Sequence, residues 1–218
     1  MKKLLLSLAI ILTITGFRVQ AQQFLEDMNG RPILETKYTN VEGSPYLRAD
    51  WTEGVVKLQN GQSFKGIQLK YDQVADELLF NHKGQTLSFV QPVQEFKLLV
   101  PGKELLFRNG FKTQEKHSDK MFFEVLFDGG TKLIGRRSKQ ITESREYNSA
   151  TTTRKFVPVE SFYIIRDGSA IKIRKDKKSV LSALSDKSNQ LENYIKTNNL
   201  NLKDEEGIVR LVEYYNSI

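Results

Sequence analysis

The stretch VVKLQNGQSFKGIQLKY, residues 55–71, decides the fold of this chain. Asn60-Gly61 separates two runs of alternating apolar and polar residues, and glycine accepts the positive φ that a tight hairpin turn needs. Ile67 and Leu69 point to one side of the second run, whereas Gln68 points to the other. The stretch therefore predicts a hairpin of half-buried antiparallel strands.

The same alternation continues toward the C-terminus. Strand candidates separated by turn residues lie at 77–81, 85–90, 95–100, 103–108 and 121–127. Asp167-Gly168 then divides two further alternating strands, and this pair of residues is another strong hairpin signal. Short strands joined by tight turns predict an antiparallel β meander over residues 54–175. Such a meander folds as a curved sheet, a sandwich or a barrel-like closed sheet.

The period of the apolar residues changes within residues 176–218. Three short stretches there have helical spacing, and Ile208, Leu211 and Val212 share one face of the last of them. Asn201 is the predicted N-cap of that helix. The predicted fold class is therefore α+β, in which three short C-terminal α-helices pack on the sheet.

Residues 1–21 have the three parts of a secretory signal peptide, which are a positive start, an apolar run and a small-residue cleavage site. The apolar run is shorter than the ~20 residues that span a bilayer. We expect cleavage near Ala21, export to the periplasm or the extracellular space, and no transmembrane segment in the mature chain. Residues 22–53 show little periodicity, which predicts an irregular N-terminal segment.

The charge of the chain is unevenly placed. The net charge is +7, and residues 131–178 hold 13 basic and 5 acidic residues. A clustered positive field favours an anionic partner, such as an anionic glycan, a lipid headgroup or an acidic protein surface. The predicted contacts are Arg136, Arg137, Lys139, Arg154 and Lys155. The alternative is that these cations keep a sheet soluble and its edges unpaired.

The polar stretch REYNSATTTRKF, residues 145–156, also leaves two interpretations open. Its hydroxyl groups, tyrosine and cations could bind a sugar or an anionic group. Threonine also favours strands, so the stretch equally fits a Thr-rich edge strand or loop.

The chain lacks the sequence motifs of the common catalytic and cofactor sites. It has no cysteine, no P-loop, no G-x-G-x-x-G and no G-x-S-x-G. His82 and His117 do not have the spacing of a zinc site. We therefore predict no catalytic residue, no cofactor and no metal site. Nucleic-acid binding is not expected, because the aromatic residues occupy core positions in the pattern and do not form a stacking platform.

Three functions fit these observations. The first is an exported, non-enzymatic binding or accessory protein of the cell envelope. The second is a carrier of an apolar, lipid-like ligand in a β-rich cavity lined by phenylalanines: Phe80, Phe89, Phe96, Phe107, Phe123 and Phe127. The third is a hydrolase with a carboxylate site, which requires a cleft where acidic residues of different strands converge.

Several motifs together resemble those of a known group of proteins. They are Tyr46-Leu47, Trp51, NGQSFKGIQLKY at 60–71, DELLF at 76–80, FFEVLFDG at 122–129 and LVEYYN at 211–216. The set resembles a family of uncharacterised exported proteins of Gram-negative bacteria, and the likeness covers nearly the whole mature chain. These are packing and turn motifs, so the resemblance implies a shared fold and export, and it implies no activity or catalytic residue.

Overall fold

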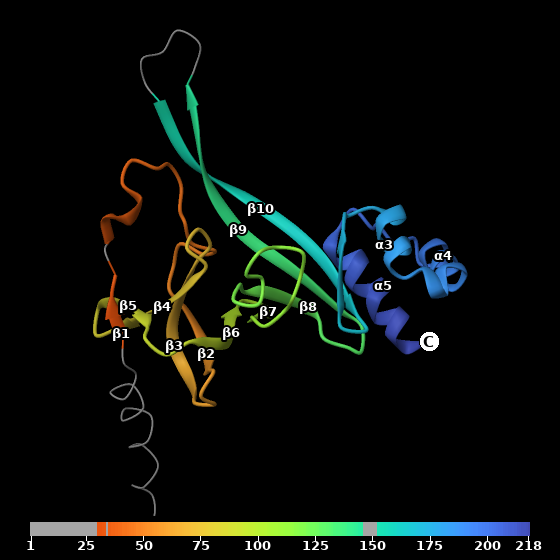
Figure 1. The fold of residues 1–218 in the computed structure, drawn as a ribbon, viewed down its shortest axis with the longest axis horizontal. Helices are drawn as coiled ribbons and strands as arrows, with labels where there is room; N and C mark the ends of the chain where they lie inside the picture. The colour runs from red at the N-terminus through yellow and green to blue at the C-terminus, as the bar shows by residue number, and fades with distance from the viewer. Residues whose placement is uncertain (1–29, 34, 146–151) are drawn as a thin grey trace, which may run out of the picture.

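A computed structural model describes residues 30–33, 35–145 and 152–218 (Figure 1). The predicted signal peptide, residues 1–21, and residues 146–151 of the polar stretch lie outside these ranges. The described chain forms an eleven-stranded sheet followed by three α-helices. The predicted α+β class is confirmed, and the sheet is open, as in the curved-sheet alternative.

The strands are β1 (Gly30–Pro32), β2 (Thr52–Leu58), β3 (Ser63–Asp72), β4 (Glu77–His82), β5 (Gln85–Phe89), β6 (Val93–Val100), β7 (Lys103–Arg108), β8 (Phe123–Phe127), β9 (Lys132–Arg145), β10 (Thr152–Arg166) and β11 (Ser169–Ile173). The helices are α3 (Lys177–Ala183), α4 (Ser188–Thr197) and α5 (Glu205–Ser217). Short 3-10 turns lie at Glu35–Tyr38 and Ser185–Lys187.

The order of the strands departs from a simple meander. All neighbours are antiparallel, in the order β1-β5-β4-β3-β2-β6-β7-β8-β9-β10-β11. Strand β6 follows β5 in the chain, but it pairs with β2. Three strands, β4, β3 and β2, therefore lie between β5 and β6 in the sheet. The three connecting residues, 90–92, span roughly 11 Å at most. The first half of the sheet, strands β1 to β7, therefore curls, which brings the end of β5 near the start of β6.

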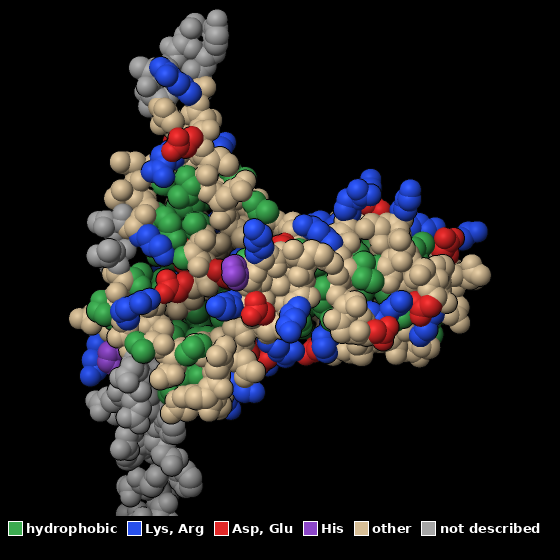
Figure 2. Space-filling view, in the orientation of Figure 1, with side chains coloured by type: hydrophobic (Ala, Val, Ile, Leu, Met, Phe, Trp, Pro, Cys, Tyr) green, Lys and Arg blue, Asp and Glu red, His purple; other side chains and the backbone are tan. Residues whose placement is uncertain are grey.

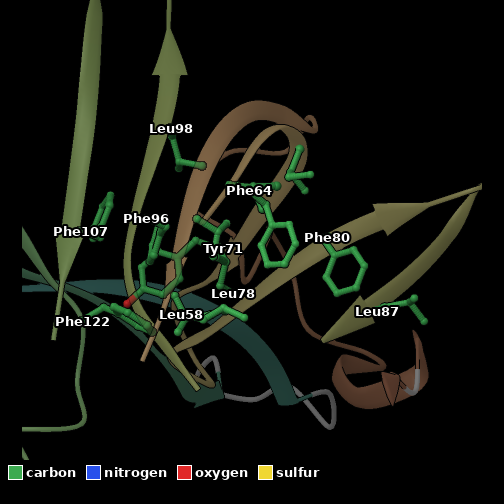
Figure 3. Packing of buried hydrophobic residues seen from close by; sticks show 14 residues of the cluster. Leu58, Phe64, Tyr71, Leu78, Phe80, Leu87, Phe96, Leu98, Phe107 and Phe122 are labelled. Atoms are coloured by element: carbon green, nitrogen blue, oxygen red, sulfur yellow. The ribbon is translucent and has the colours of Figure 1, made fainter. Parts of the chain in front are cut away.

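The concave side of this curl holds the first hydrophobic core. Figure 3 shows Tyr71, Phe96 and Phe107 converging from three strands, with Phe122 below them. The rings of Phe96 and Phe107 are stacked with their centroids 4.8 Å apart. The alternation that began at Ile67 and Leu69 supplies this core, because every second side chain of a strand points to the same face.

A second core lies between β8–β11 and the helices. Leu133 of β9 and Phe162 and Ile164 of β10 face apolar residues of α3, α4 and α5. Their chain neighbours Ile134 and Tyr163 point to the opposite face and pack under the loop before β8. The helices are therefore held by one face of a sheet that is buried on both sides.

Helix α5 begins later than predicted. Its N-cap is Asp204, so the assignment of Asn201 as the N-cap is wrong. The Asn201 side chain instead accepts a hydrogen bond from the Lys203 amide and donates one to the Asp204 carboxylate. It organises the turn before the helix, which a short polar side chain does as readily as it caps.

Strands β9 and β10 form a long hairpin that extends away from the rest of the sheet (Figure 1). The N-terminal segment lies against it, since Glu42 exchanges main-chain hydrogen bonds with Arg154 and Phe156. The described parts of the stretch 145–156, which are Arg145 and residues 152–156, belong to these two strands. Within the described ranges, no helix is long and apolar enough to cross a membrane.

Candidate functional site

Arg136 is buried, although the sequence predicts it as a surface contact. Only 8% of the residue is exposed. Its guanidinium pairs with Asp76 at 3.2 Å and donates hydrogen bonds to the Tyr71 hydroxyl and the Phe122 carbonyl. Burial raises the pKa of the Asp76 carboxyl, while Arg136 and Tyr71 act to lower it. Arg136 is therefore not a surface contact, and it joins β9 to the first half of the sheet.

Arg137 points to the opposite face of β9 and is surrounded by carboxylates. It forms ion pairs with Glu124 at 2.7 Å, with Glu160 at 2.5 Å and with Glu205. Burial acts to lower the pKa of Arg137, whereas the hydrogen bonds and charges of Glu124 and Glu205 raise it above its ordinary value. Because Glu205 opens α5, this guanidinium fastens the last helix to the sheet.

The other three predicted contacts differ in exposure. The Lys139 ammonium donates hydrogen bonds to the carbonyls of Ser44 and Tyr46, and burial lowers its pKa. Arg154 is half-buried and pairs with Glu143 along the hairpin, at 3.1 Å. Lys155 is exposed. The structure thus leaves one of the five, Lys155, as a freely accessible cation.

A group of exposed cations lies elsewhere, where β11 leads into α3. We define the basic ridge as five exposed residues: Lys172, Arg174, Lys175, Lys177 and Lys178. Figure 2 shows Lys and Arg side chains gathered over this end of the molecule. Three carboxylates, those of Glu160, Asp176 and Glu192, lie within ion-pair distance of the ridge. The ridge therefore keeps an excess of positive charge on the surface.

Local structure keeps the ridge exposed. Ile171 and Ile173 point toward the second core, so Lys172 and Arg174 alternate outward. The Asp176 side chain caps α3 by accepting a hydrogen bond from the Ser179 amide, at 2.7 Å. The first turn of the helix thus presents Lys177 and Lys178 beside the strand end. The run KIRKDKK, residues 172–178, was the sequence signal for this surface.

A shallow groove of about 480 Å³ adjoins the ridge. Lys177 and Lys178 line it together with Leu181, Glu192 and three serines, Ser182, Ser185 and Ser188. Ammonium and hydroxyl groups both donate hydrogen bonds. The groove therefore offers donors to an oxyanion, and the Glu192 carboxylate is its one acidic side chain.

The phenylalanines expected to line a carrier cavity belong to packed cores. Phe80, Phe96, Phe107 and Phe123 are at most 1% exposed. Phe89 packs against Phe80 with ring centroids 4.6 Å apart, and Phe127 packs on the second core. An apolar ligand would have to displace these side chains.

Acidic residues from different segments line one cleft, as the hydrolase alternative requires. Asp76, Glu77 and Asp119 line an open cleft of about 520 Å³. The Asp76 carboxylate is occupied by Arg136 and Tyr71, and Glu77 lies 3.7 Å from Lys37. Among the described residues, no group of three or more histidines and carboxylates could hold a metal ion.

Comparison of the chain with protein-family models, with curated proteins and with solved structures finds no match.

Proposed function

We propose that this chain is an exported, non-enzymatic accessory protein of the cell envelope that binds phosphate-bearing lipid headgroups through the basic ridge. The observation that carries the proposal is the exposure of all five ridge cations, whereas Arg136 is buried and Arg137 and Lys139 are partly buried. The N-terminal sequence supports export.

The chemistry of the ridge favours phosphate over other anionic partners. Exposed lysines act as point charges on flexible stems, which suits a fluid anionic surface better than a rigid bidentate site. The hydroxyls of Ser182 and Ser185 in the adjoining groove can donate hydrogen bonds to phosphate oxygens, whereas the Ser188 hydroxyl donates to the Ser185 carbonyl. Each cation near an anionic membrane contributes about 1 kcal/mol of binding free energy. We therefore expect the contributions of the five ridge cations to add up.

The test is sedimentation of the protein with vesicles of phosphatidylglycerol and phosphatidylcholine, at low and at high salt. The test variant carries Lys172→Glu, Lys175→Glu and Lys178→Glu. We expect it to bind the anionic vesicles at least about tenfold more weakly than the unaltered protein, because three favourable contacts are lost. High salt should weaken the unaltered protein in the same way.

A matched control changes the same charge elsewhere. Lys57, Lys65 and Lys103 are exposed residues of the first half of the sheet. A variant with all three changed to glutamate has the same net charge as the ridge variant, and we expect it to retain most of the binding. Equal loss in both variants would indicate attraction by net charge alone and would contradict a ridge site. Binding to free phosphate but not to vesicles would contradict the lipid assignment.

A further inference from the structure

The cleft of about 520 Å³ lies at one end of the curled half of the sheet. Segments that are far apart in the sequence form its walls: the residue after β2, the connection from β5 to β6, the residue after β7 and the end of the loop before β8. Its volume falls within the range of small-molecule sites, about 300–1,000 Å³. No residue of the basic ridge lines it.

Main-chain hydrogen bonds hold these walls in place. The Gln59 amide donates to the Pro92 carbonyl at 2.9 Å, and the Gly110 amide donates to the Asp119 carbonyl at 2.9 Å. The Asn109 side-chain amide donates to the Val93 carbonyl at 2.7 Å. The cleft is therefore formed before any ligand arrives.

A buried ion pair fixes one wall more firmly. The Phe122 amide donates to the Asp76 carboxylate, and the Phe122 carbonyl accepts from Arg136, both at 3.3 Å. Figure 3 shows Phe122 beside the Tyr71 hydroxyl, which also bonds to Asp76. Arg136 and Asp76 thus bind the main-chain carbonyl and amide of Phe122, which lines the cleft. Arg136 and Asp76 are positioning residues for this wall.

The cleft is close to electrically neutral. Asp76 is balanced by Arg136, and Glu77 lies within ion-pair distance of Arg31 and Lys37. The remaining charges on the lining, Asp119 and Lys120, have opposite signs. An anionic or cationic ligand therefore gains little from this lining, so the charges favour a neutral ligand.

The lining combines polar amides with apolar surface. Gln59, Gln91 and Asn109 carry carboxamides, which both donate and accept hydrogen bonds. Phe89 and Pro92 supply accessible apolar surface, while the Phe122 ring is only 6% exposed and belongs to the first core. A sugar matches both halves of this lining, because its hydroxyl groups donate and accept while its C–H faces are apolar. An apolar ligand would leave the carboxamides without partners.

We propose that this cleft binds a neutral sugar unit. The carboxamides of Gln59 and Gln91 and the carboxylate of Asp119 contact its hydroxyl groups, while Phe89 and Pro92 pack against its C–H face. The cleft shares no residue with the basic ridge, so sugar binding and lipid binding can be tested independently of each other.

The test is saturation-transfer NMR on the full chain with glucose, galactose and N-acetylglucosamine, with glucuronate and glucosamine as charged probes. We expect at least one neutral sugar to bind with a dissociation constant of about 1 mM, a typical affinity for a small polar ligand in an open site. Changing Gln59, Gln91 and Asp119 together to alanine should weaken that binding by at least about tenfold. All three side chains are exposed, so the variant should remain folded.

A matched control variant changes Gln68, Gln85 and Asp50 to alanine, which are exposed residues outside the cleft. It should bind the sugar as the unaltered chain does. The proposal is overturned if no neutral sugar shows saturation transfer, if only a charged probe binds, or if the cleft variant and the control variant bind equally well.

Discussion

Arg136 links residues that lie far apart in the chain. Its guanidinium contacts Tyr71 in β3, Asp76 in the following turn and Phe122 ahead of β8. Removal of one partner of a buried ion pair leaves the other charge without compensation in a poorly solvated place. The loss of stability on removing the Arg136 side chain therefore depends on the unpaired Asp76 carboxylate that remains.

We expect Arg136→Met to lower the free energy of unfolding by about 3 kcal/mol, because the Asp76 carboxylate, only 18% exposed, loses its cation. The measurement is urea denaturation followed by the fluorescence of Trp51. Adding Asp76→Asn should restore part of the loss, since the amide is neutral and still reaches Tyr71. A loss below about 1 kcal/mol would mean that the pair behaves like a solvated surface pair.

Gly54 of β2 is a second residue with a measurable role. A Cβ atom at this position would lie 2.2 Å from the Lys97 carbonyl oxygen and 2.5 Å from a Leu69 methyl group. Since main chain has to move to relieve the first contact, we expect Gly54→Ala to cost about 1–3 kcal/mol of stability.

Gly130→Ala is the matched control, because its added Cβ would meet only the Asn216 side chain, at an ordinary 3.5 Å. Thermal or urea denaturation should show a change within about 0.5 kcal/mol for this variant. Equal effects of the two substitutions would contradict the close approach of β2 and β6.

At the scale of elements, Asn216 joins the end of α5 to the turn between β8 and β9. The Asn216 carboxamide accepts a hydrogen bond from the Thr131 amide at 2.8 Å and donates one to the Thr131 carbonyl at 3.0 Å. Thr131 is buried in the β8–β9 turn, so its main-chain groups have few other partners.

We therefore expect Asn216→Ala to cost about 2 kcal/mol, close to the sum of two net hydrogen bonds. Amide hydrogen exchange at Thr131 should speed up in the same variant. Ser217→Ala is the control, because the Ser217 hydroxyl bonds only within its own helix, to the Tyr214 carbonyl. Slow exchange at Thr131 in the Asn216→Ala protein would show that the contact is not needed.

Local signals predicted the elements better than their arrangement. Asp167 and Gly168 both have positive φ, as the hairpin signal requires, and helices follow where the period changes. The return of β6 to β2 depends on how the whole half-sheet curls, which no short stretch encodes. The N-cap was misassigned because Asn201 and Asp204 are both good capping residues, and only packing selects between them.

Four of the five predicted contacts have partners within the protein, and the sequence did not indicate this for a related reason. A count of charges identifies the excess of basic residues over 131–178, but it does not identify the carboxylates that pair with them, because most of these come from other elements. Asp76 is 60 residues from Arg136, and Glu205 is 68 residues from Arg137. The basic ridge lies within one local run, so its exposure follows from strand alternation and a helix start. The cleft had no sequence signal, since its lining comes from loops and strand ends that are separate in the sequence.

At the scale of the whole molecule, the sheet has a narrow waist. Strands β7 and β8 pair through only two residue pairs, Phe107 with Glu124 and Arg108 with Phe123. The first core and the proposed sugar cleft lie on one side, and the second core and the basic ridge lie on the other. Contacts from β9 supplement this short ladder, chiefly those of Arg136 and of Lys139.

We expect these contacts to couple the two halves, so that they unfold together. Trp51 fluorescence reports the first half, and far-ultraviolet circular dichroism reports the helices of the second. The two urea transitions should coincide in the unaltered protein, as two-state unfolding requires. In the double variant Arg136→Met and Lys139→Met, the first half loses the contacts of these two cations, whereas the hydrogen bonds between Gln73 and the main chain of β9 remain and the second core is untouched. Its Trp51 transition should then move to lower urea, ahead of the helical transition.

The control for this experiment is Lys70→Met, which changes a lysine over Trp51 within the first half and leaves the contacts of β9 unaltered. Its two transitions should still coincide. If they are already separate in the unaltered protein, the halves are independent units joined by a short ladder. If they still coincide in the double variant, the β7–β8 pairing and the hydrogen bonds of Gln73 to β9 carry the coupling. Either result would mean that Arg136 and Lys139 do not couple the unfolding of the two halves.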